Sequence, residues 1–246
     1  MRVPAHLGYR RRKPKALTTI LATAVRLLVA VAVVYLLVTG FVVTSVRELS
    51  ASMEPTLEQR DLLLVSPLIW GPRVPFTGLR IPGLRAPERG ELVLLATPQD
   101  ERTSLARRLL DVAVRFLTLQ RATVSGLDAD DRPPRLTVKR IIGVPGDTVR
   151  MAGYRAEVRP AGATEFAAEP SLSRRSYEPR IGAELPDATP FGGSLPEVVL
   201  GEGEYFVLGD NRGDSSDSRS WGAVRMERFV GVVIWRYFPL RRFGRP

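Results

Sequence analysis

The hydrophobic residues nearest the start of the chain form one almost continuous run. Seventeen uncharged residues occupy positions 27–43, and the moderately apolar stretch 16–25 precedes them. This length is at the short end for a helix that crosses a bilayer, but Arg26 can extend toward the lipid head groups and add the preceding turns to the span. The pattern predicts one transmembrane helix within residues 16–44.

Positive charge precedes this helix. Residues 1–15 contain six basic and no acidic side chains, and such a bias keeps the flanking tail in the cytoplasm. We therefore expect a single-pass protein of the cytoplasmic membrane, with a basic cytoplasmic tail at 1–15 and an extracytoplasmic domain at 45–246. A cleaved signal peptide is the alternative, but the apolar region is long and no small-x-small site precedes a suitable mature start.

The pattern after the anchor predicts a mainly β domain of about 200 residues. Short apolar runs are bounded by turn residues, and strands do not alternate with helices. The predicted strands are 62–65, 91–96, 136–142, 148–151, 205–208 and 229–237. Pro-Gly-Asp at 145–147 and Gly-Asp-Asn at 209–211 are typical of tight turns between strands.

Three segments interrupt this pattern and are predicted to be insertions. In 66–88 the apolar residues are spaced by Pro and Gly, and an exposed segment of this kind would contact lipid. Residues 153–203 are rich in Pro, Gly, Ala and Glu, which favours a loop-heavy surface excursion. In 98–135 five apolar residues recur at helical spacing and predict an amphipathic helix, packed on the membrane surface or on the β-domain. They are Leu105, Leu109, Val112, Phe116 and Leu119.

Composition narrows the chemistry that the chain can perform. It has no cysteine and a single histidine, His6, in the N-terminal tail. A Ser-His-Asp triad, thiol chemistry, disulfides and zinc sites of the Cys/His kind are therefore excluded. No metal or cofactor is expected; carboxylate sites for magnesium or calcium stay open, although no acidic run has EF-hand spacing. Much of the net charge of +10 is explained by the basic tail that sets the membrane orientation. Nothing therefore indicates a nucleic acid partner.

Lys139 is the one lysine outside the N-terminal tail. The 36 basic residues include only three lysines, of which Lys13 and Lys15 lie in the tail, whereas Lys139 lies in an apolar, strand-like stretch. A desolvated lysine can lose its proton and act as a neutral base, which an arginine cannot do. Lys139 is the candidate general base; the alternative is a lysine held in an ion pair or snorkelling from a strand.

Ser52 is the candidate nucleophile. It lies in the segment Ser-Ala-Ser-Met-Glu-Pro-Thr-Leu at 50–57, nine residues beyond Val43. At no more than about 3.5 Å per residue, the serine is tethered within roughly 30 Å of the membrane face. Capping or turn formation would also explain a serine here, so the case depends on the motifs that accompany it.

Three motifs follow one another in the chain. They are the segment at 50–57, Val-Lys-Arg-Ile-Ile-Gly-Val-Pro-Gly-Asp at 138–147, and Gly-Asp-Asn-Arg-Gly-Asp-Ser-Ser-Asp-Ser-Arg at 209–219. With these motifs the sequence closely resembles bacterial type I signal peptidases, the membrane-bound Ser-Lys endopeptidases that remove signal peptides from exported proteins. The resemblance covers the anchor and every strand-like block of the outer domain.

The resemblance implies the roles of the catalytic groups. Ser52 would be the nucleophile and Lys139 the general base. Ser50 would supply a hydroxyl to the oxyanion hole beside the Ser52 backbone N–H, and Ser215 would hold the lysine amine in position.

The resemblance also implies the surroundings of these groups. Asp217 and Arg219 would form a supporting ion pair. Three apolar residues would line the pocket for the substrate residue before the scissile bond: Met53, Leu57 and Val138.

The fold and substrates implied by the resemblance are equally specific. The family has antiparallel β-sheets around an extended substrate groove, shared distantly with the self-cleaving SOS repressors. Cleavage would follow a small-x-small motif, typically Ala-x-Ala, through an acyl-enzyme and without a cofactor. Exported preproteins that carry signal peptides and membrane lipid are the expected partners, and the translocon is a further candidate.

Other classes fit the sequence less well. Serine acylases of the β-lactamase type need Ser-x-x-Lys on one helical turn, whereas 87 positions separate Ser52 from Lys139. A self-cleaving repressor would carry a DNA-binding region where this chain has its apolar helix. A non-enzymatic, membrane-tethered β-module is the remaining alternative to a peptidase of this kind. Among related peptidases, one dedicated to a single pilus or conjugation precursor is a further alternative.

Overall fold

The computed structural model describes residues 15–72, 79–97, 136–181 and 192–246. The chain divides into two compact units, 1–37 and 38–246. The first contains helix α1 (Lys15–Leu37), whose 23 residues give a length of about 34 Å. Among the described residues it is the one helix long and apolar enough to cross a membrane, with the span at Thr18–Tyr35.

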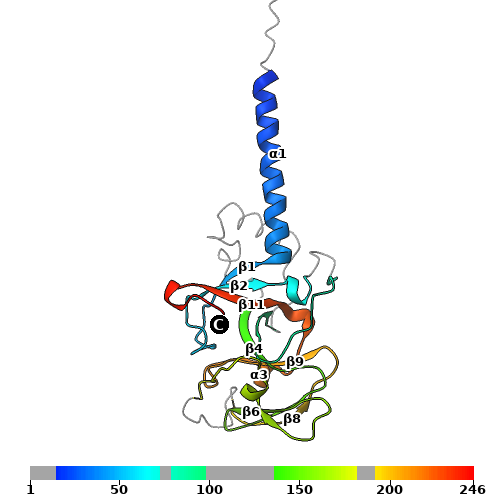
Figure 1. Cartoon of the computed structure of the whole chain (residues 1–246), viewed down its shortest axis with the longest axis vertical. Helices are drawn as coiled ribbons and strands as arrows, with labels where there is room; N and C mark the ends of the chain where they lie inside the picture. Colours follow the sequence, from blue (N-terminus) through cyan, green and yellow to red (C-terminus); the bar gives the residue numbers. More distant parts are fainter. Residues whose placement is uncertain (1–14, 73–78, 98–135, 182–191) are drawn as a thin grey trace, which may run out of the picture. The chain divides into compact units, whose positions relative to one another are not determined.

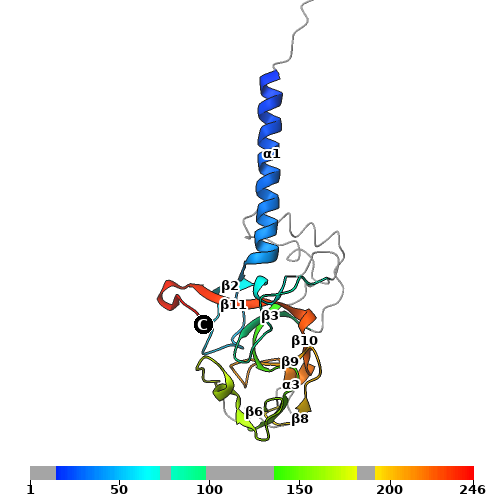
Figure 2. The ribbon, with the colours of Figure 1, turned by 45° about the vertical axis from the view of Figure 1, so that its right-hand side comes forward.

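The larger unit is built on a seven-stranded antiparallel sheet, in the order β1-β2-β11-β3-β4-β9-β10 (Figures 1 and 2). Its strands are β1 (Thr44–Arg47), β2 (Leu62–Ser66), β3 (Leu92–Ala96), β4 (Leu136–Gly143), β9 (Glu204–Leu208), β10 (Val224–Arg225) and β11 (Phe229–Phe238). Five of the six strands expected from the sequence lie in this sheet. The sixth, expected at 148–151, is a strand of a second sheet.

Short helical turns join the strands. They are the π-helical turn η1 (Val38–Val42), helix α3 (Ser218–Trp221) and the 3-10 turns η2 (Leu68–Trp70), η4 (Glu169–Leu172), η5 (Met226–Arg228) and η6 (Leu240–Arg242). The transmembrane segment expected at 16–44 therefore comprises α1, η1 and the start of β1.

The centre of the large sheet is apolar on both faces. Side chains of β3 alternate between two clusters: Val93 and Leu95 join one, and Leu92 and Leu94 join the other. A strand covered on both sides shows a continuous apolar run rather than alternation with polar residues. This burial places Lys139, on the neighbouring strand β4 opposite Val93, deep in the domain.

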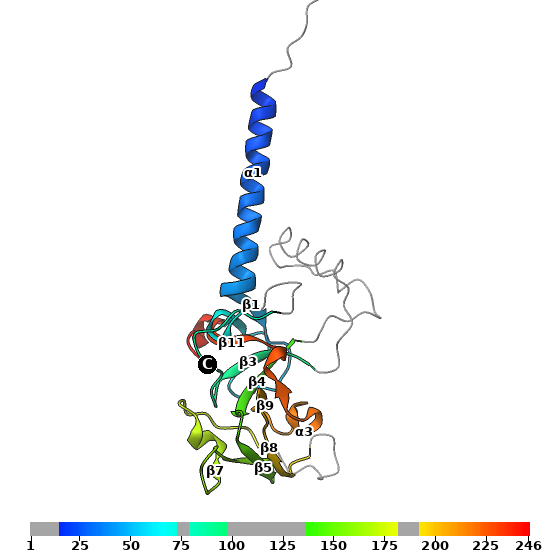
Figure 3. The ribbon, with the colours of Figure 1, turned by 90° about the vertical axis from the view of Figure 1, so that its right-hand side faces the viewer.

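A second sheet corrects the expectation for 153–203. It has the order β7-β6-β5-β8, with β5 (Thr148–Ala152), β6 (Arg155–Arg159), β7 (Ala167–Ala168) and β8 (Leu195–Val199). Three of its four strands come from the segment predicted as a loop-heavy excursion, so that prediction was wrong. In β6, the buried Ala156 and Val158 alternate with charged residues, and the surrounding Pro and Gly residues obscured this two-residue period. Figure 3 shows this sheet beyond the ends of β4 and β9.

The other two insertions are only partly described. The helix expected around 105–119 lies outside the described residues. In 66–88, Trp70 is buried against the core, but Leu79, Ile81 and Leu84 are 66%, 42% and 78% exposed. The described part of this insertion thus presents these three apolar side chains to the surroundings.

A buried ion pair joins the second sheet to the loop that follows β9. Arg212 pairs with Glu169 of η4 and donates to the carbonyl oxygens of Gly209 (3.0 Å) and Tyr154 (3.1 Å). Both charged side chains are almost completely buried. Since a charge buried without its partner is strongly unfavourable, this contact fixes the loop on the sheet.

We predict that Arg212→Met lowers the free energy of unfolding by about 3–5 kcal/mol, because Glu169 loses its partner. Urea unfolding of the detergent-solubilised protein measures the change. The matched control is Arg150→Met, which breaks an exposed pair with Glu157 (2.8 Å) and should cost at most about 1 kcal/mol. Equal losses in the two variants would contradict the structural role of Arg212.

Candidate active site

The loop that carries Ser52 is fixed by its own turns and by a distant segment. Within the loop, the Leu57 N–H donates to the Met53 carbonyl oxygen at 2.9 Å. From the loop after β9, Asn211 donates its backbone N–H to the Ser52 carbonyl oxygen (3.0 Å) and its side-chain amide to that of Ala51 (3.2 Å). Ser52 is 5% exposed, so its hydroxyl is held in a shielded position.

Lys139 reaches this hydroxyl from β4. Its Nζ lies 2.7 Å from Ser52 Oγ, and the residue is 2% exposed. Among the described carboxylates none forms an ion pair with it. Burial lowers the pKa of Lys139, and Arg219 acts in the same direction, whereas Asp217, Glu48 and Asp210 oppose the shift. The amine can therefore be neutral at a pH where a solvated lysine is charged.

Arginines hold the two aspartates whose charges act on the Lys139 amine. Arg140, the residue after Lys139, binds Asp210 through Nε (2.8 Å) and Nη2 (2.6 Å). Arg219 binds Asp217 through Nε (2.8 Å) and Nη2 (2.9 Å), and both of these side chains are buried. The ion pair expected between Asp217 and Arg219 is thus present. Because each aspartate already has an arginine as its ion-pair partner, neither depends on Lys139 for a counter-charge.

Ser215 lies in the site without the hydrogen bond expected of it. Its Oγ is buried and has no hydrogen-bond partner among the described residues, so the bond to the Lys139 amine is not formed here. Gly209 lies against it: a Cβ on that glycine would be 2.1 Å from Ser215 Oγ and 2.6 Å from the Ser52 carbonyl oxygen. The absence of a side chain at 209 allows Ser215 to lie beside the loop that carries Ser52.

The three expected pocket residues share one apolar cluster next to Ser52. Met53 and Leu57 are 0% exposed and Val138 is 1% exposed, and they pack with residues of β2 and β3. This is the burial of core residues rather than of an open pocket wall.

Glu48 was not found by sequence reasoning. It follows β1, is 4% exposed, and accepts hydrogen bonds at Oε1 from the Ser50 hydroxyl (2.6 Å) and backbone N–H (3.0 Å). Ser50 Oγ in turn lies 3.0 Å from Ser52 Oγ. The two-residue period of a strand puts Glu48 on the face of Val46, which packs on the core. That alternation was the available signal.

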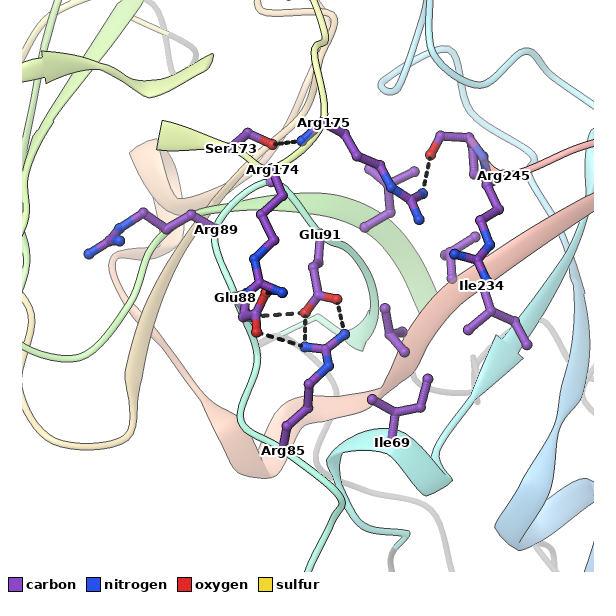
Figure 4. Close-up of a pocket in the computed structure, with 15 residues that line it drawn as sticks. Ile69, Arg85, Glu88, Arg89, Glu91, Ser173, Arg174, Arg175, Ile234 and Arg245 are labelled. Carbon is purple, nitrogen blue, oxygen red and sulfur yellow. Dashed lines mark hydrogen bonds and ion pairs between the residues drawn. The ribbon is translucent and has the colours of Figure 1, made fainter. Parts of the chain in front are cut away.

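A cavity elsewhere in the domain is lined by arginines but by none of these residues. It encloses about 340 Å³, and five arginines line it: Arg85, Arg89, Arg174, Arg175 and Arg245. Figure 4 shows the guanidinium of Arg85 on the carboxylate of Glu91 and Arg174 beside Glu88. Arg89 pairs with Asp147 (2.6 Å). Since Arg85, Arg89 and Arg174 already have carboxylate partners and Arg175 donates to the Pro246 carbonyl oxygen (3.3 Å), the cavity is not a second candidate site. Among the described residues, no group of three or more His, Cys, Asp or Glu could hold a metal ion.

The comparisons with known proteins identify the family of this chain. The family model described as signal peptidase, peptidase S26, matches residues 20–238. The chain is 26% identical over 205 residues to signal peptidase I of Pseudomonas aeruginosa, covering 81% of this chain and 63% of that protein. It is 30% identical over 195 residues to the probable signal peptidase I-2 of Synechocystis, covering 79% and 63%. The chain thus spans less than two thirds of the length of these two relatives.

A serine hydroxyl in contact with a buried, unpaired lysine amine fits the class of serine hydrolases in which lysine takes the place of histidine as base. The fold is the mainly antiparallel β fold expected of such an enzyme. The chain belongs to the signal peptidase family, peptidase S26.

We predict that the Lys139 amine titrates below the ordinary lysine value of 10.5, because burial disfavours its charged form. Replacing Lys13 and Lys15 by arginine leaves Lys139 as the sole lysine, so NMR of protein with isotopically labelled lysine reads this group alone. The same protein unfolded in urea is the control and should titrate at the ordinary value. Titration of the folded protein at or above the control would contradict a neutral base.

Proposed function

We propose that this protein is a membrane-bound serine endopeptidase that removes signal peptides from exported preproteins. The observation that carries the proposal is the 2.7 Å contact of Ser52 Oγ with a lysine that is 2% exposed. Similarity to relatives named signal peptidase I supports the same substrate class. Ser52 is the nucleophile in this proposal, and Lys139 is the general base.

Acylation begins with neutral Lys139. In that form the hydrogen bond between the two groups runs from the Ser52 hydroxyl to Nζ, and the amine takes the proton as Oγ attacks the scissile carbonyl. The protonated amine then gives its proton to the leaving nitrogen, which releases the mature chain. A water molecule attacks the acyl-enzyme with Lys139 again as base and frees the signal peptide.

The oxyanion hole is proposed to combine two donors. The Ser52 backbone N–H donates to no other described residue and is therefore free for the developing oxyanion. The second donor is the hydroxyl of Ser50, 3.0 Å from Ser52 Oγ. Loss of one such donor generally costs about 10²- to 10³-fold in rate. Ser215 is proposed to steady the amine once substrate has closed the site.

The membrane arrangement follows from charge and length. The proposed topology has the basic tail in the cytoplasm, α1 across the cytoplasmic membrane and the β-domain outside. A signal peptide is itself an apolar helix in the same bilayer, so the short link from α1 to Ser52 keeps the nucleophile near the membrane face where the cleavage site emerges. Membrane lipid is thus a partner of the enzyme.

Ser52→Ala and Lys139→Arg should each abolish processing of a preprotein while leaving the fold intact. Alanine removes the nucleophile, and arginine keeps the charge but cannot accept a proton. Purified variants in detergent are incubated with several unrelated preproteins, and circular dichroism checks the fold. Lys15→Arg is the matched control and should keep full activity. An active Lys139→Arg protein would defeat the proposed role of the lysine, and inactivity of the unaltered protein on every preprotein would defeat the proposed substrate class.

The residue before the cut should have to be small. Met53, Leu57 and Val138 are almost completely buried, and forcing a bulky group into a packed cluster costs at least about 1–3 kcal/mol. An extended substrate presents alternate residues to one face, so the first and third positions are the ones selected. In a preprotein series with Ala, Ser, Leu, Phe and Lys at the first position, only Ala and Ser should be cleaved well. Efficient cleavage after Phe or Lys would contradict this pocket.

A further inference from the structure

Glu48 is a buried acid at the edge of the site for which the reaction described above has no use. Its backbone is held on both sides, since its N–H donates to the Asp61 carbonyl oxygen (2.9 Å) and its own carbonyl oxygen accepts from the Arg60 N–H (2.8 Å). No ion pair with a described residue stabilises its carboxylate. A buried carboxylate is costly without a counter-ion, so an apolar side chain would serve the fold better at this position.

The carboxylate is one end of a chain of hydrogen bonds. Lys139 Nζ and Ser52 Oγ are 2.7 Å apart, Ser52 Oγ and Ser50 Oγ are 3.0 Å apart, and Ser50 Oγ and Glu48 Oε1 are 2.6 Å apart. Each hydroxyl has one proton to donate. With the lysine charged and the glutamate ionised, every hydrogen bond in the chain is donated in the direction of Glu48. The Ser52 proton then points away from Lys139, and the Ser50 proton is not available to an oxyanion.

A net transfer of one proton from Lys139 to Glu48 along this chain reverses the direction of every hydrogen bond in it. The lysine gives a proton to Ser52, Ser52 gives its own to Ser50, and Ser50 gives its own to Glu48, with no change in total charge or in the number of protons. Afterwards Lys139 is neutral, the Ser52 hydroxyl donates to Nζ, and the Ser50 hydroxyl points toward the nucleophile. This second order is the one that acylation needs.

We propose that Glu48 is a positioning residue that acts through Ser50: as a carboxylate it holds the chain in the resting order, and as a carboxylic acid it holds the chain in the reactive order. The proposal deepens the function proposed above and rests on it. Glu48 does not touch the substrate; it decides where the protons of the two serines lie.

The charges around the chain are compatible with this exchange. Burial raises the pKa of Glu48, while the hydrogen bonds from Ser50 and the charge of Lys139 lower it. Burial lowers the pKa of Lys139, as described above, so the two groups are shifted toward each other. The other charged groups that act on the lysine come from the segment after β9: Asp217, Arg219 and Asp210.

Kinetics of single and double variants test the link to Ser50. Glu48→Ala should lower kcat for preprotein cleavage about 10- to 100-fold, the loss expected from one hydrogen bond to a charged group, with KM unchanged. Glu48→Gln should restore most of this loss, because its amide can accept from Ser50 or donate to it and so imitates the neutral acid. In a Ser50→Ala background, neither change should have a further effect.

Titration of Lys139 in the protein that has no other lysine tests, without any substrate, how the charge of Glu48 acts on the amine. Since the carboxylate favours the charged amine, Glu48→Gln should shift deprotonation of Lys139 to lower pH. The rising limb of the pH–rate profile should move with it. Glu157→Gln is the matched control; it removes one negative charge from an exposed pair with Arg150 and should leave the titration in place.

Two results would overturn the proposal for Glu48. One is an equal loss of kcat on Glu48→Ala with and without Ser50, or no loss at all. The other is an unmoved Lys139 titration in Glu48→Gln, which also decides the matter if Glu48→Ala fails to fold. Failure of the unaltered protein to cleave preproteins, together with a shifted titration, would instead refute the peptidase function and leave the arrangement of the protons standing.

Discussion

The removal of the Lys139 amine from water is the constraint on which the rest of the site depends. A lysine is a base only when its charged form is made unfavourable, and a carboxylate in direct contact would undo this. The structure meets both needs. Strands of the central sheet exclude water, and the aspartates nearest the amine, Asp210 and Asp217, are held by Arg140 and Arg219. Permanent cations thus hold these two aspartates, and the amine that can lose its proton forms no ion pair with a described carboxylate.

Burial of the Lys139 amine requires several segments of the fold to meet at the site. Ser52 comes from the loop after β1, Lys139 from β4, and Ser215 from the loop after β9. Gly209 allows these segments to approach, since a side chain there would collide with two of them. The buried pair of Arg212 and Glu169 then ties the last loop to the second sheet. Rigid surroundings of this kind hold the Ser52 hydroxyl and the Lys139 amine in contact without substrate.

Glu48 extends this picture from one pair to a chain of four groups. A lysine that is always charged could not accept a proton and could not act as a base. A second buried group that can take the proton gives the site two states of equal total charge. Because β1 leads from the apolar N-terminal segment to Glu48, Ser50 and Ser52, the proposed chain of hydrogen bonds lies in the part of the β-domain closest in sequence to the apolar helix α1.

The sequence by itself determined the apolar helix, six strands and the candidate pair of Ser52 and Lys139. These follow from local patterns: long apolar runs, short runs between turn residues, and one lysine among many arginines after the N-terminal tail. It did not predict the strands within 153–203, because their alternation is short and masked by Pro and Gly. Only the tertiary structure decided that Glu48 is buried against Ser50, that Ser215 lacks the expected bond and that the pocket residues are closed, since each depends on contacts between segments far apart in the chain.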